Sequence, residues 1–290
     1  MGKTVAFNSE KDHTLFMKDF LSPSYMQEKF NSYKIIREYN TNNIDFKNLL
    51  IKEIIKKDIA KKEDLNKYNN SLENLHKCLN ESKKNLDDTE QNEVSVNFYE
   101  VSNSFKKIYF KFLKTCLVDI FKEPIYFQSV PTFRFHFPNQ KGYEWEDRYH
   151  TDIMLGHPPY EFNVWIPLTK VFSTNSMRIT PLDDSLRFLE GVNYDFELFA
   201  ENVQYDDYFI KNLKEKSSSL EMDYGQFIIF DPRCLHCTQN NQTNATRISL
   251  DIRIITESGL RKYSREYRTT GRKKMLFQPG HYFSETPIKL

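Results

Sequence analysis

The chain has 290 residues, and its 41 Lys and Arg side chains almost balance 40 Asp and Glu side chains, which gives a formal net charge of +1. A chain of this length can bury a large core within one domain, and its near-zero net charge offers no bulk field to attract nucleic acid or an anionic membrane. Four scattered cysteines exclude a disulfide framework, and the lack of an apolar leader or of about 18 consecutive apolar residues favours a cytoplasmic protein with no membrane partner.

The N-terminal part of the chain, residues 1–122, is predicted to be mainly helical. Between residues 51 and 90, isoleucines and then leucines recur at helical spacing among balanced charges, which predicts a pair of charged amphipathic helices. Residues 96–121 predict a third, strongly apolar helix that is long enough to pack against a sheet. We interpret all three helices as scaffold.

From residue 125 onward the hydrophobic period changes to two, as a β-strand requires. Phe133, Phe135 and Phe137 should point to one face of a strand, with Arg134 and His136 on the other. Further short strands, separated by Pro, Asn, Asp and Gly, are predicted in the segments EFNVWIPLT, SMRITPL, GQFIIFDP and RISLDIRIITE.

This order of elements predicts a single domain, 1–290, that is mainly β with helical support. Its core should be a jelly roll (a double-stranded β-helix, cupin-like) that carries the N-terminal helices on one sheet. The core is expected over residues 123–258. Residues 185–220 should interrupt it with a helix and a loop over one mouth of the barrel, and residues 259–290 should form a basic, loop-like tail.

Three polar residues near predicted strand ends form a candidate metal site. His150 and Asp152 stand two positions apart, so on an extended strand both would point to the same side and could reach one ion. His236 follows a buried apolar strand and a DPRCL turn. Two histidines and one carboxylate are the ligand set of non-haem Fe(II) oxygenases, and this set leaves coordination positions open. A closed structural zinc site would instead need four protein ligands, with cysteine prominent.

A second pair of residues lies on the strand that follows His236. Arg247 and Ser249 alternate along this strand and therefore share a face. A guanidinium can hold the distal carboxylate of 2-oxoglutarate through two parallel charge-assisted hydrogen bonds, and a serine hydroxyl can add one more. The pair therefore predicts a 2-oxoglutarate site beside the metal.

A family resemblance rests on the segments YHTD, GHPPYEFNVWIPLT, TNSMRITPLDDS, GQFIIFDPRCLH and the RIS of ATRIS. With these segments the sequence resembles Fe(II)/2-oxoglutarate-dependent oxygenases of the phytanoyl-CoA dioxygenase-like superfamily, and within it the streptomycin-biosynthesis hydroxylase-like branch. The resemblance implies that His150, Asp152 and His236 bind iron. It also implies that Arg247 and Ser249 bind the distal carboxylate of 2-oxoglutarate.

The resemblance extends to two further residues and shows one departure. It implies that Asn163 and Trp165 line the 2-oxoglutarate pocket. Members of the superfamily typically carry a Gly-Ser-His turn after the strand that resembles SMRITP, and here LDDS stands in its place. The substrate-side loop is therefore the part for which the resemblance gives the least guidance.

Together these features predict a dioxygenase that uses Fe(II), O2 and the co-substrate 2-oxoglutarate to hydroxylate a C–H bond, with release of succinate and CO2. Desaturation and epimerisation use the same residues and stay open. Three polar residues expected near the site, Arg134, His136 and Arg178, favour a small polar substrate such as an amino acid, an amino sugar, a sugar or a nucleotide sugar. The branch that the sequence resembles favours a role in biosynthesis.

Two other classes of protein remain as alternatives. A cupin-like isomerase or epimerase would also be a β-barrel with histidines, but it would not need Arg247 and Ser249. A non-catalytic β-sandwich binding protein would need none of the three metal donors. The sequence does not fix the oligomeric state, so a homo-oligomer is also left open.

Overall fold

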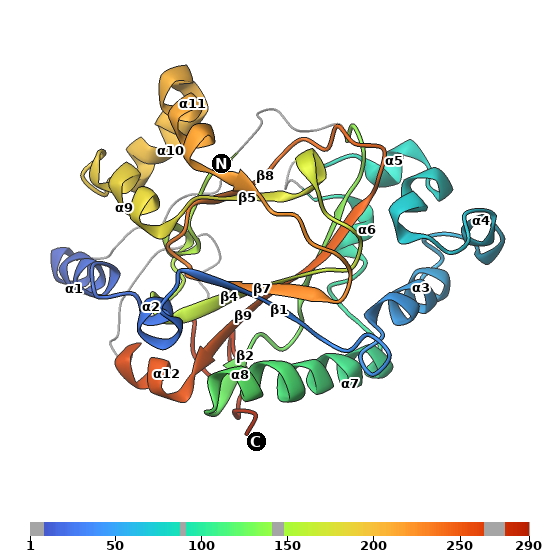
Figure 1. Ribbon diagram of the computed structural model, residues 1–290, viewed down its shortest axis with the longest axis horizontal. Coiled ribbons are helices and arrows are strands. Elements are labelled where there is room, and N and C mark those ends of the chain that lie inside the picture. The colour runs from blue at the N-terminus through green and yellow to red at the C-terminus, as the bar shows by residue number, and fades with distance from the viewer. Residues whose placement is uncertain (1–8, 88–90, 141–147, 264–275, 290) are drawn as a thin grey trace.

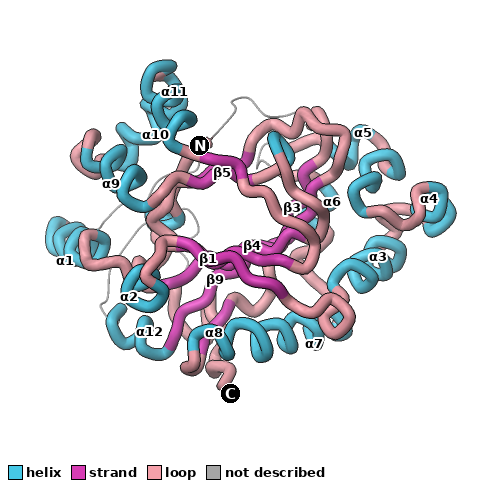
Figure 2. Tube along the Cα trace, in the orientation of Figure 1, coloured by secondary structure: helices cyan, strands magenta, loops and turns pink. Residues whose placement is uncertain are grey.

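The structure, a computed structural model, describes residues 9–87, 91–140, 148–263 and 276–289. At its centre two antiparallel sheets lie opposite each other, with helices around them (Figure 1 and Figure 2). The main sheet has the order β1–β7–β4–β9–β2, and β3 also pairs with β9; its strands are β1 (Lys34–Glu38), β2 (Ile125–Phe127), β3 (Thr132–His136), β4 (Glu161–Pro167), β7 (Gln226–Phe230) and β9 (Arg247–Thr256). The second sheet has the order β6–β5–β8 and consists of β5 (Met177–Ile179), β6 (Ser218–Ser219) and β8 (His236–Thr238).

The chain alternates between the two sheets as it proceeds. After β3 in the main sheet, His150 forms an isolated bridge to His236 of β8 in the second sheet, and the chain then returns to the main sheet with β4. β5 and β6 belong to the second sheet, β7 to the main sheet, β8 to the second and β9 to the main. This is the connectivity of a jelly roll. Apolar side chains that include Trp165, Met177 and Ile228 form a core between the sheets.

Strands are present in the predicted segments, and they pair antiparallel, but the expectation of a mainly β protein is wrong. Helices contain more of the described residues than strands do, so the fold is mixed α/β. Many of these helices are shorter than the roughly 11 residues over which hydrophobic periodicity can be recognised in a sequence. The strands carry a stronger signal because they form the buried centre.

A helical rod packs on the outer face of the main sheet, as predicted. It consists of α7 (Asn103–Phe112), the π-helix η2 (Leu113–Val118) and α8 (Asp119–Phe121), which follow one another without a break beneath the sheet (Figure 1). Phe112 packs edge-on against Phe227 of β7, with their ring centroids 5.1 Å apart. Because such aromatic contacts bury large apolar areas, the rod supports the sheet whose other face carries the polar side chains.

The rod begins later than the sequence pattern indicates. The Ser102 Oγ accepts a hydrogen bond from the backbone N–H of Phe105 at 3.2 Å, which caps the helix and fixes its start. Residues 97–102 are not helical, and α6 (Glu93–Val96) is a separate turn.

Residues 51–87 form several short helical pieces rather than the pair of amphipathic helices that was predicted. Left-handed residues interrupt the chain, among them Asp58 with φ 53° and Asn69 with φ 54°. Asp and Asn tolerate this conformation, and a helix cannot continue through it. The pieces are α3 (Phe46–Lys56), α4 (Lys62–Lys67), the 3-10 helix η1 (Leu72–Cys78) and α5 (Glu81–Lys84).

The N-terminal part also contributes a strand that the sequence did not predict. β1 follows α1 (Glu10–Phe20) and α2 (Tyr25–Phe30) and pairs with β7 at the edge of the main sheet. Its sequence, KIIRE, carries charged residues and shows no clean alternation. Short, charged strands are common at sheet edges, where they resist pairing with other chains.

The insert contains more helix than expected. Three helices and β6 occupy it, in place of one helix and a loop: α9 (Leu182–Glu190), α10 (Phe196–Tyr205) and α11 (Asp207–Lys216). The side chains of Asp195 and Asp206 accept hydrogen bonds from the first turns of α10 and α11. These helices pack with α1 in a cluster that also includes Leu235 and Cys237, next to the second sheet.

The C-terminal part differs from the predicted loop-like tail. Residues 257–263 form α12 (Glu257–Tyr263), and residues 264–275, which contain much of the predicted basic tail, lie outside the described residues. The following segment returns to the main sheet through bridges from Phe283 to Gln128 and from Ile288 to Ile125. Within the described ranges, no helix combines the length and the apolar character that crossing a bilayer would require.

Candidate metal centre and the cavity beside it

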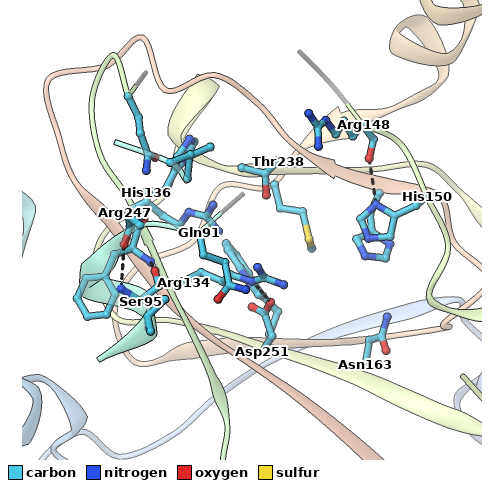
Figure 3. A pocket seen from close by; sticks show the side chains of 18 of the residues that line it. Gln91, Ser95, Arg134, His136, Arg148, His150, Asn163, Thr238, Arg247 and Asp251 are labelled. Atoms are coloured by element: carbon cyan, nitrogen blue, oxygen red, sulfur yellow. Dashed lines mark hydrogen bonds and ion pairs between the residues drawn. The ribbon is translucent and has the colours of Figure 1, made fainter. Parts of the chain in front are cut away.

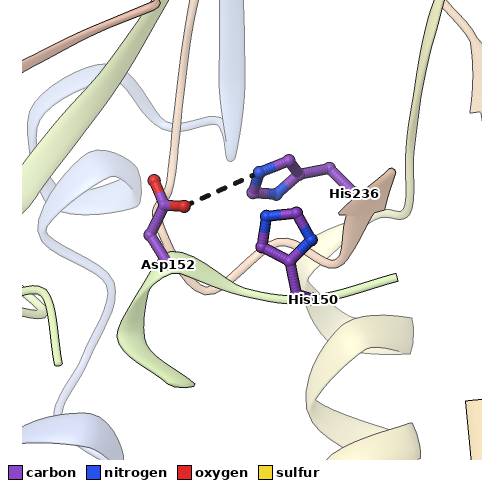
Figure 4. Close-up of side chains that lie close together, drawn as sticks. All are labelled: His150, Asp152 and His236. Atoms are coloured by element: carbon purple, nitrogen blue, oxygen red, sulfur yellow. Dashed lines mark ion pairs between the residues drawn. The ribbon is translucent and has the colours of Figure 1, made fainter. Parts of the chain in front are cut away.

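His150, Asp152 and His236 lie together between the two sheets (Figure 4), and each offers a ligand atom within 4.8 Å of the others. The backbone joins the two histidines directly: the N–H of His150 donates to the carbonyl of His236 at 3.1 Å, and the reverse bond measures 3.0 Å. Their ring centroids are 4.5 Å apart. The predicted convergence of three distant donors is therefore present in the structure.

Both imidazoles are oriented by the same kind of contact. Nδ1 of His150 lies 3.0 Å from the carbonyl oxygen of Arg148, and Nδ1 of His236 lies 2.9 Å from that of Cys234. A ring nitrogen that donates to a carbonyl must carry the proton, which leaves Nε2 as the lone-pair donor. Each histidine thus presents Nε2 to the space shared with Asp152.

Asp152 reaches the site by a different route from the one predicted. It is not on an extended strand, because it begins the 3-10 helix η3 (Asp152–Leu155), and its N–H donates to the carbonyl of Pro232 at 3.2 Å. Its two carboxylate oxygens have different neighbours. Oδ1 lies 3.8 Å from Nε2 of His236, and Oδ2 accepts a hydrogen bond of 2.7 Å from Nε of Arg253.

The turn that presents His236 is held by a buried ion pair. The Arg233 guanidinium donates to Oδ2 of Asp231 at 2.9 Å, and its NH1 group also donates to the backbone carbonyls of Phe20 and Ser22. Both charged side chains are almost fully buried. A buried charge is tolerated when it is paired and hydrogen-bonded in this way, so the DPRCL turn has a defined shape.

The charges of the three donors suit a divalent cation. Burial, together with the nearby His236, lowers the pKa of His150 to about 4, so this imidazole is neutral at pH 7. Burial alone would raise the pKa of Asp152, but Arg253 and His236 reverse the shift and hold that pKa well below its usual range. Two neutral imidazoles and one carboxylate, with ligand atoms within 4.8 Å of one another, fit Fe(II).

A cavity of about 810 Å³ lies beside the triad (Figure 3). Strand β9 supplies much of its polar lining, since Arg247, Asp251 and Arg253 face the cavity while Ile248 and Ile252 are fully buried on the opposite face. His150 and His236 also line this space. Both histidines and the predicted 2-oxoglutarate residue Arg247 therefore border one cavity.

Arg247 is the best placed of the residues predicted to bind 2-oxoglutarate. It is 3% exposed and lines the cavity, and its guanidinium carbon lies 5.8 Å from the ring centroid of Trp165, which lines the cavity as well. Ser249 is fully buried and does not line the cavity; its Oγ accepts a hydrogen bond from NH1 of Arg247 at 3.2 Å. The serine thus supports the arginine.

Asn163 has an unusual environment for a buried amide. The side chain lines the cavity on β4, opposite Arg253 of β9, and is 1% exposed. Neither its oxygen nor its nitrogen has a hydrogen-bond partner among the described residues. Because burying an amide without a partner is costly, this side chain is suited to contact a bound ligand.

The predicted substrate residues separate into two groups. Arg134 and His136 line the cavity, and Nε of Arg134 donates to Oδ2 of Asp251 at 3.0 Å (Figure 3). Arg178 does not line it. Its guanidinium donates instead to the hydroxyls of Tyr149 and Ser217 and to nearby carbonyls at the end of α11, which makes it a structural tie.

Sequence reasoning missed several residues of the cavity. Gln91 and Ser95 come from the helical N-terminal part, and no pattern in the sequence connects them to the strands. Asp251 had a usable signal, because it continues the alternation of Arg247 and Ser249 along β9. Any residue at an even distance from Arg247 on that strand faces the same way.

The family model for phytanoyl-CoA dioxygenase (PhyH) matches residues 53–249, which is more than half of the chain. The protein therefore belongs to the phytanoyl-CoA dioxygenase family. It is a member of a family of Fe(II)/2-oxoglutarate-dependent dioxygenases, with His150, Asp152 and His236 as the candidate iron-binding triad.

Individual relatives are more distant. The streptomycin biosynthesis protein StrG of Streptomyces griseus is 24% identical over 162 residues, which are 56% of this chain and 60% of StrG. The match thus spans 60% of the length of that curated relative. Among solved structures, EctD from S. alaskensis with bound Fe is 13% identical, with a TM-score of 0.48, over 82% of this chain and 78% of EctD. The α-ketoglutarate-dependent carbocyclase SnoK from nogalamycin biosynthesis is 11% identical, with a TM-score of 0.45, over 88% and 87% of the two chains.

Proposed function

We propose that this protein is a hydroxylase that binds Fe(II) through His150, Asp152 and His236 and oxidises a C–H bond of a small polar molecule. One observation carries the proposal: both histidines of the triad and Arg247 border the same cavity of about 810 Å³. Ligand pockets typically measure about 300–1,000 Å³, so the cavity can take 2-oxoglutarate and a small second substrate together.

The triad has a simple division of roles. His150 and His236 would bind the ion through Nε2, because Nδ1 of each ring faces a backbone carbonyl. Asp152 would bind through Oδ1 and would bring one negative charge to the ion. When bound, Fe(II) would allow O2 to oxidise two partners at once: one oxygen atom would enter the C–H bond of the substrate, and the other would enter 2-oxoglutarate, which would be released as succinate and CO2.

Arg247 would hold the distal carboxylate of 2-oxoglutarate. Its guanidinium donates to Ser249 and lies over the Trp165 ring, so little side-chain freedom remains to be lost on binding. Asn163, whose amide lacks a partner among the described residues, would contact the same co-substrate. Arg247 and Asn163 both lie on the polar face that β9 and β4 turn toward the cavity.

The remaining polar groups favour a small hydrophilic substrate. Arg134, paired with Asp251, and His136 line the cavity on β3 and β9, while Gln91 and Ser95 line it from the N-terminal part. A lipid chain could form no hydrogen bonds with this charged and polar lining, whereas an amino acid, a sugar or an amino sugar could. The similarity to StrG, which is named for streptomycin biosynthesis, supports a role in biosynthesis.

We further infer that the whole chain works as one oxygenase domain. β1, from the N-terminal part, and the C-terminal segment around Phe283 and Ile288 are both joined to the main sheet. Neither end of the described chain forms a separate core, which supports a single unit over residues 1–290.

Anaerobic titration tests the proposal directly. Addition of Fe(II) and then 2-oxoglutarate should produce a visible charge-transfer band, and the Asp152→Ala variant should not develop it. A panel of amino acids, sugars and amino sugars should then be screened for substrate-dependent release of succinate. Absence of the band in the wild-type protein would contradict the proposal.

The same measurements separate the alternatives. A cupin-like isomerase or epimerase would convert its substrate without consuming 2-oxoglutarate, and a non-catalytic binding protein would bind a ligand without release of succinate. Desaturation or an oxidative epimerisation would release succinate but leave no added hydroxyl group on the product. Mass spectrometry distinguishes these outcomes, because only hydroxylation adds the mass of one oxygen atom, about 16 daltons, to the substrate.

A further inference from the structure

Arg253 touches the carboxylate of the candidate triad. Its Nε donates to Oδ2 of Asp152 at 2.7 Å, and the two side chains are 14% and 2% exposed. The other carboxylate oxygen, Oδ1, lies 3.8 Å from Nε2 of His236. The two oxygens are thus assigned to different neighbours: Oδ2 to the guanidinium, and Oδ1 to the space that the histidines share.

The position of Arg253 in the sheet explains why it can make this contact. It faces the cavity on β9, opposite Asn163 of β4, and β9 is the strand between β3 and β4 in the main sheet. Within the described residues, the Arg253 side chain makes one hydrogen bond, and Asp152 accepts it. The arginine therefore reaches the triad from the main sheet, whereas both histidines approach from the side of the second sheet.

We infer that Arg253 is a positioning residue that holds Asp152 as a one-oxygen ligand of the metal. This inference rests on the proposed function, because it requires the triad to bind an ion. A carboxylate that turned both oxygens to the ion would occupy one of the positions that the triad leaves open, and the co-substrate and O2 need those positions. Partners that orient ligand side chains are known to influence metal affinity strongly.

The protein contains a matched comparison for this role. Arg134 donates through Nε to Oδ2 of Asp251 at 3.0 Å, and this pair borders the same cavity. The two pairs share donor atom and acceptor atom. They differ in burial, since the Arg134 side chain is 51% exposed, and Asp251 is not a member of the triad. Substitution of either arginine removes one positive charge from the cavity, whereas only substitution of Arg253 should weaken metal binding.

The test is Mn²⁺ binding to the full chain, measured by calorimetry and by electron paramagnetic resonance of the free ion. Mn²⁺ is used because it does not oxidise during the measurement. Arg253→Gln should weaken Mn²⁺ binding by about 10- to 100-fold, the range typical of residues that orient metal ligands. Arg134→Gln should bind Mn²⁺ as the wild-type protein does.

A second variant covers the case in which Arg253→Gln does not fold. Arg253→Lys keeps the positive charge but loses the fixed planar donor, so it should retain the fold and still bind Mn²⁺ more weakly than the wild type. The Co²⁺ visible spectrum should also change in this variant, because the carboxylate would be free to turn.

Each result has one meaning. If both Arg253 variants fold and bind Mn²⁺ as tightly as the wild type, or if Arg134→Gln loses as much affinity, the role of Arg253 is refuted while the proposed function stands. If the wild-type protein itself binds neither Mn²⁺ nor Fe²⁺, the proposed function fails first.

Discussion

His136 and Arg247 are register partners on β3 and β9, and both side chains border the cavity. His136 is 2% exposed, and burial, reinforced by the neighbouring guanidinium, lowers the pKa of its imidazole well below the usual range. The histidine is therefore neutral at physiological pH, and Arg247 provides the positive charge at this end of the cavity.

The low pKa of His136 predicts a loss of stability in acid. Below about pH 6.5 the unfolded chain binds a proton at this residue and the folded chain does not, so folding stability falls as the pH decreases, by up to about 1.4 kcal/mol per pH unit. In metal-free protein, His136→Gln should therefore lose less stability between about pH 7.5 and 5.5 than the wild type, by roughly 1–2 kcal/mol. Urea unfolding at the two pH values measures the difference. Equal losses in both proteins would contradict the prediction.

Substitution of Arg247 should act on 2-oxoglutarate and not on the metal. Arg247→Gln removes a charged, two-bond contact worth about 1.5–3 kcal/mol, so the dissociation constant for 2-oxoglutarate should rise by roughly 10- to 100-fold. Calorimetric titration of the Mn²⁺-loaded protein measures this change. Mn²⁺ affinity and the melting temperature serve as controls, and an unaltered 2-oxoglutarate affinity would remove Arg247 from the site.

Removal of the carboxylate donor should have the largest effect on metal binding. Asp152→Ala deletes one of three ligands, so its Mn²⁺ affinity should fall by more than the roughly 10- to 100-fold typical for residues that only orient a ligand. Asp251→Asn is the matched control, because Asp251 borders the same cavity outside the triad. Equal affinities in the two variants would argue against Asp152 as a ligand.

Phe162 should be essential for stability although it is remote from the chemistry. Its ring centroid lies 4.7 Å from that of Phe121 in α8 and 5.4 Å from that of Tyr25 in α2, and the side chain is fully buried. Phe162→Ala should therefore lower the free energy of unfolding by about 3–5 kcal/mol. Tyr205→Ala, at a ring that is 76% exposed, should change it by no more than about 0.5 kcal/mol. Urea unfolding of both variants tests this contrast.

The strands and the triad were predictable for the same physical reason. A buried strand such as Phe227–Phe230 is apolar, so a polar residue shortly after it, such as His236, indicates a candidate functional residue. Arg247 followed from the alternation of side chains along one strand. These signals are local, since each depends on residues that are adjacent in the chain.

What the sequence could not show depends on contacts between distant segments. The bond between Arg253 and Asp152 joins residues on β9 and η3, and neither residue alone indicates its partner. Gln91 enters the cavity from the N-terminal helical part, which periodicity marks as scaffold. Asp152 was assigned to a strand because the His-x-Asp spacing suits one, yet it begins a 3-10 turn, and its N–H donates to the carbonyl of Pro232, far along the chain.

The donors of the triad come from two separate stretches of the chain, one at 150–152 and the other at 236, which meet through a reciprocal pair of backbone hydrogen bonds. An ion bound there would link the two stretches. It would raise the free energy of unfolding by about 2.7 kcal/mol when the ion concentration is 100 times its dissociation constant. Resistance to limited proteolysis should then rise with added Mn²⁺. Occupancy of the centre could be followed in this way before any substrate has been identified.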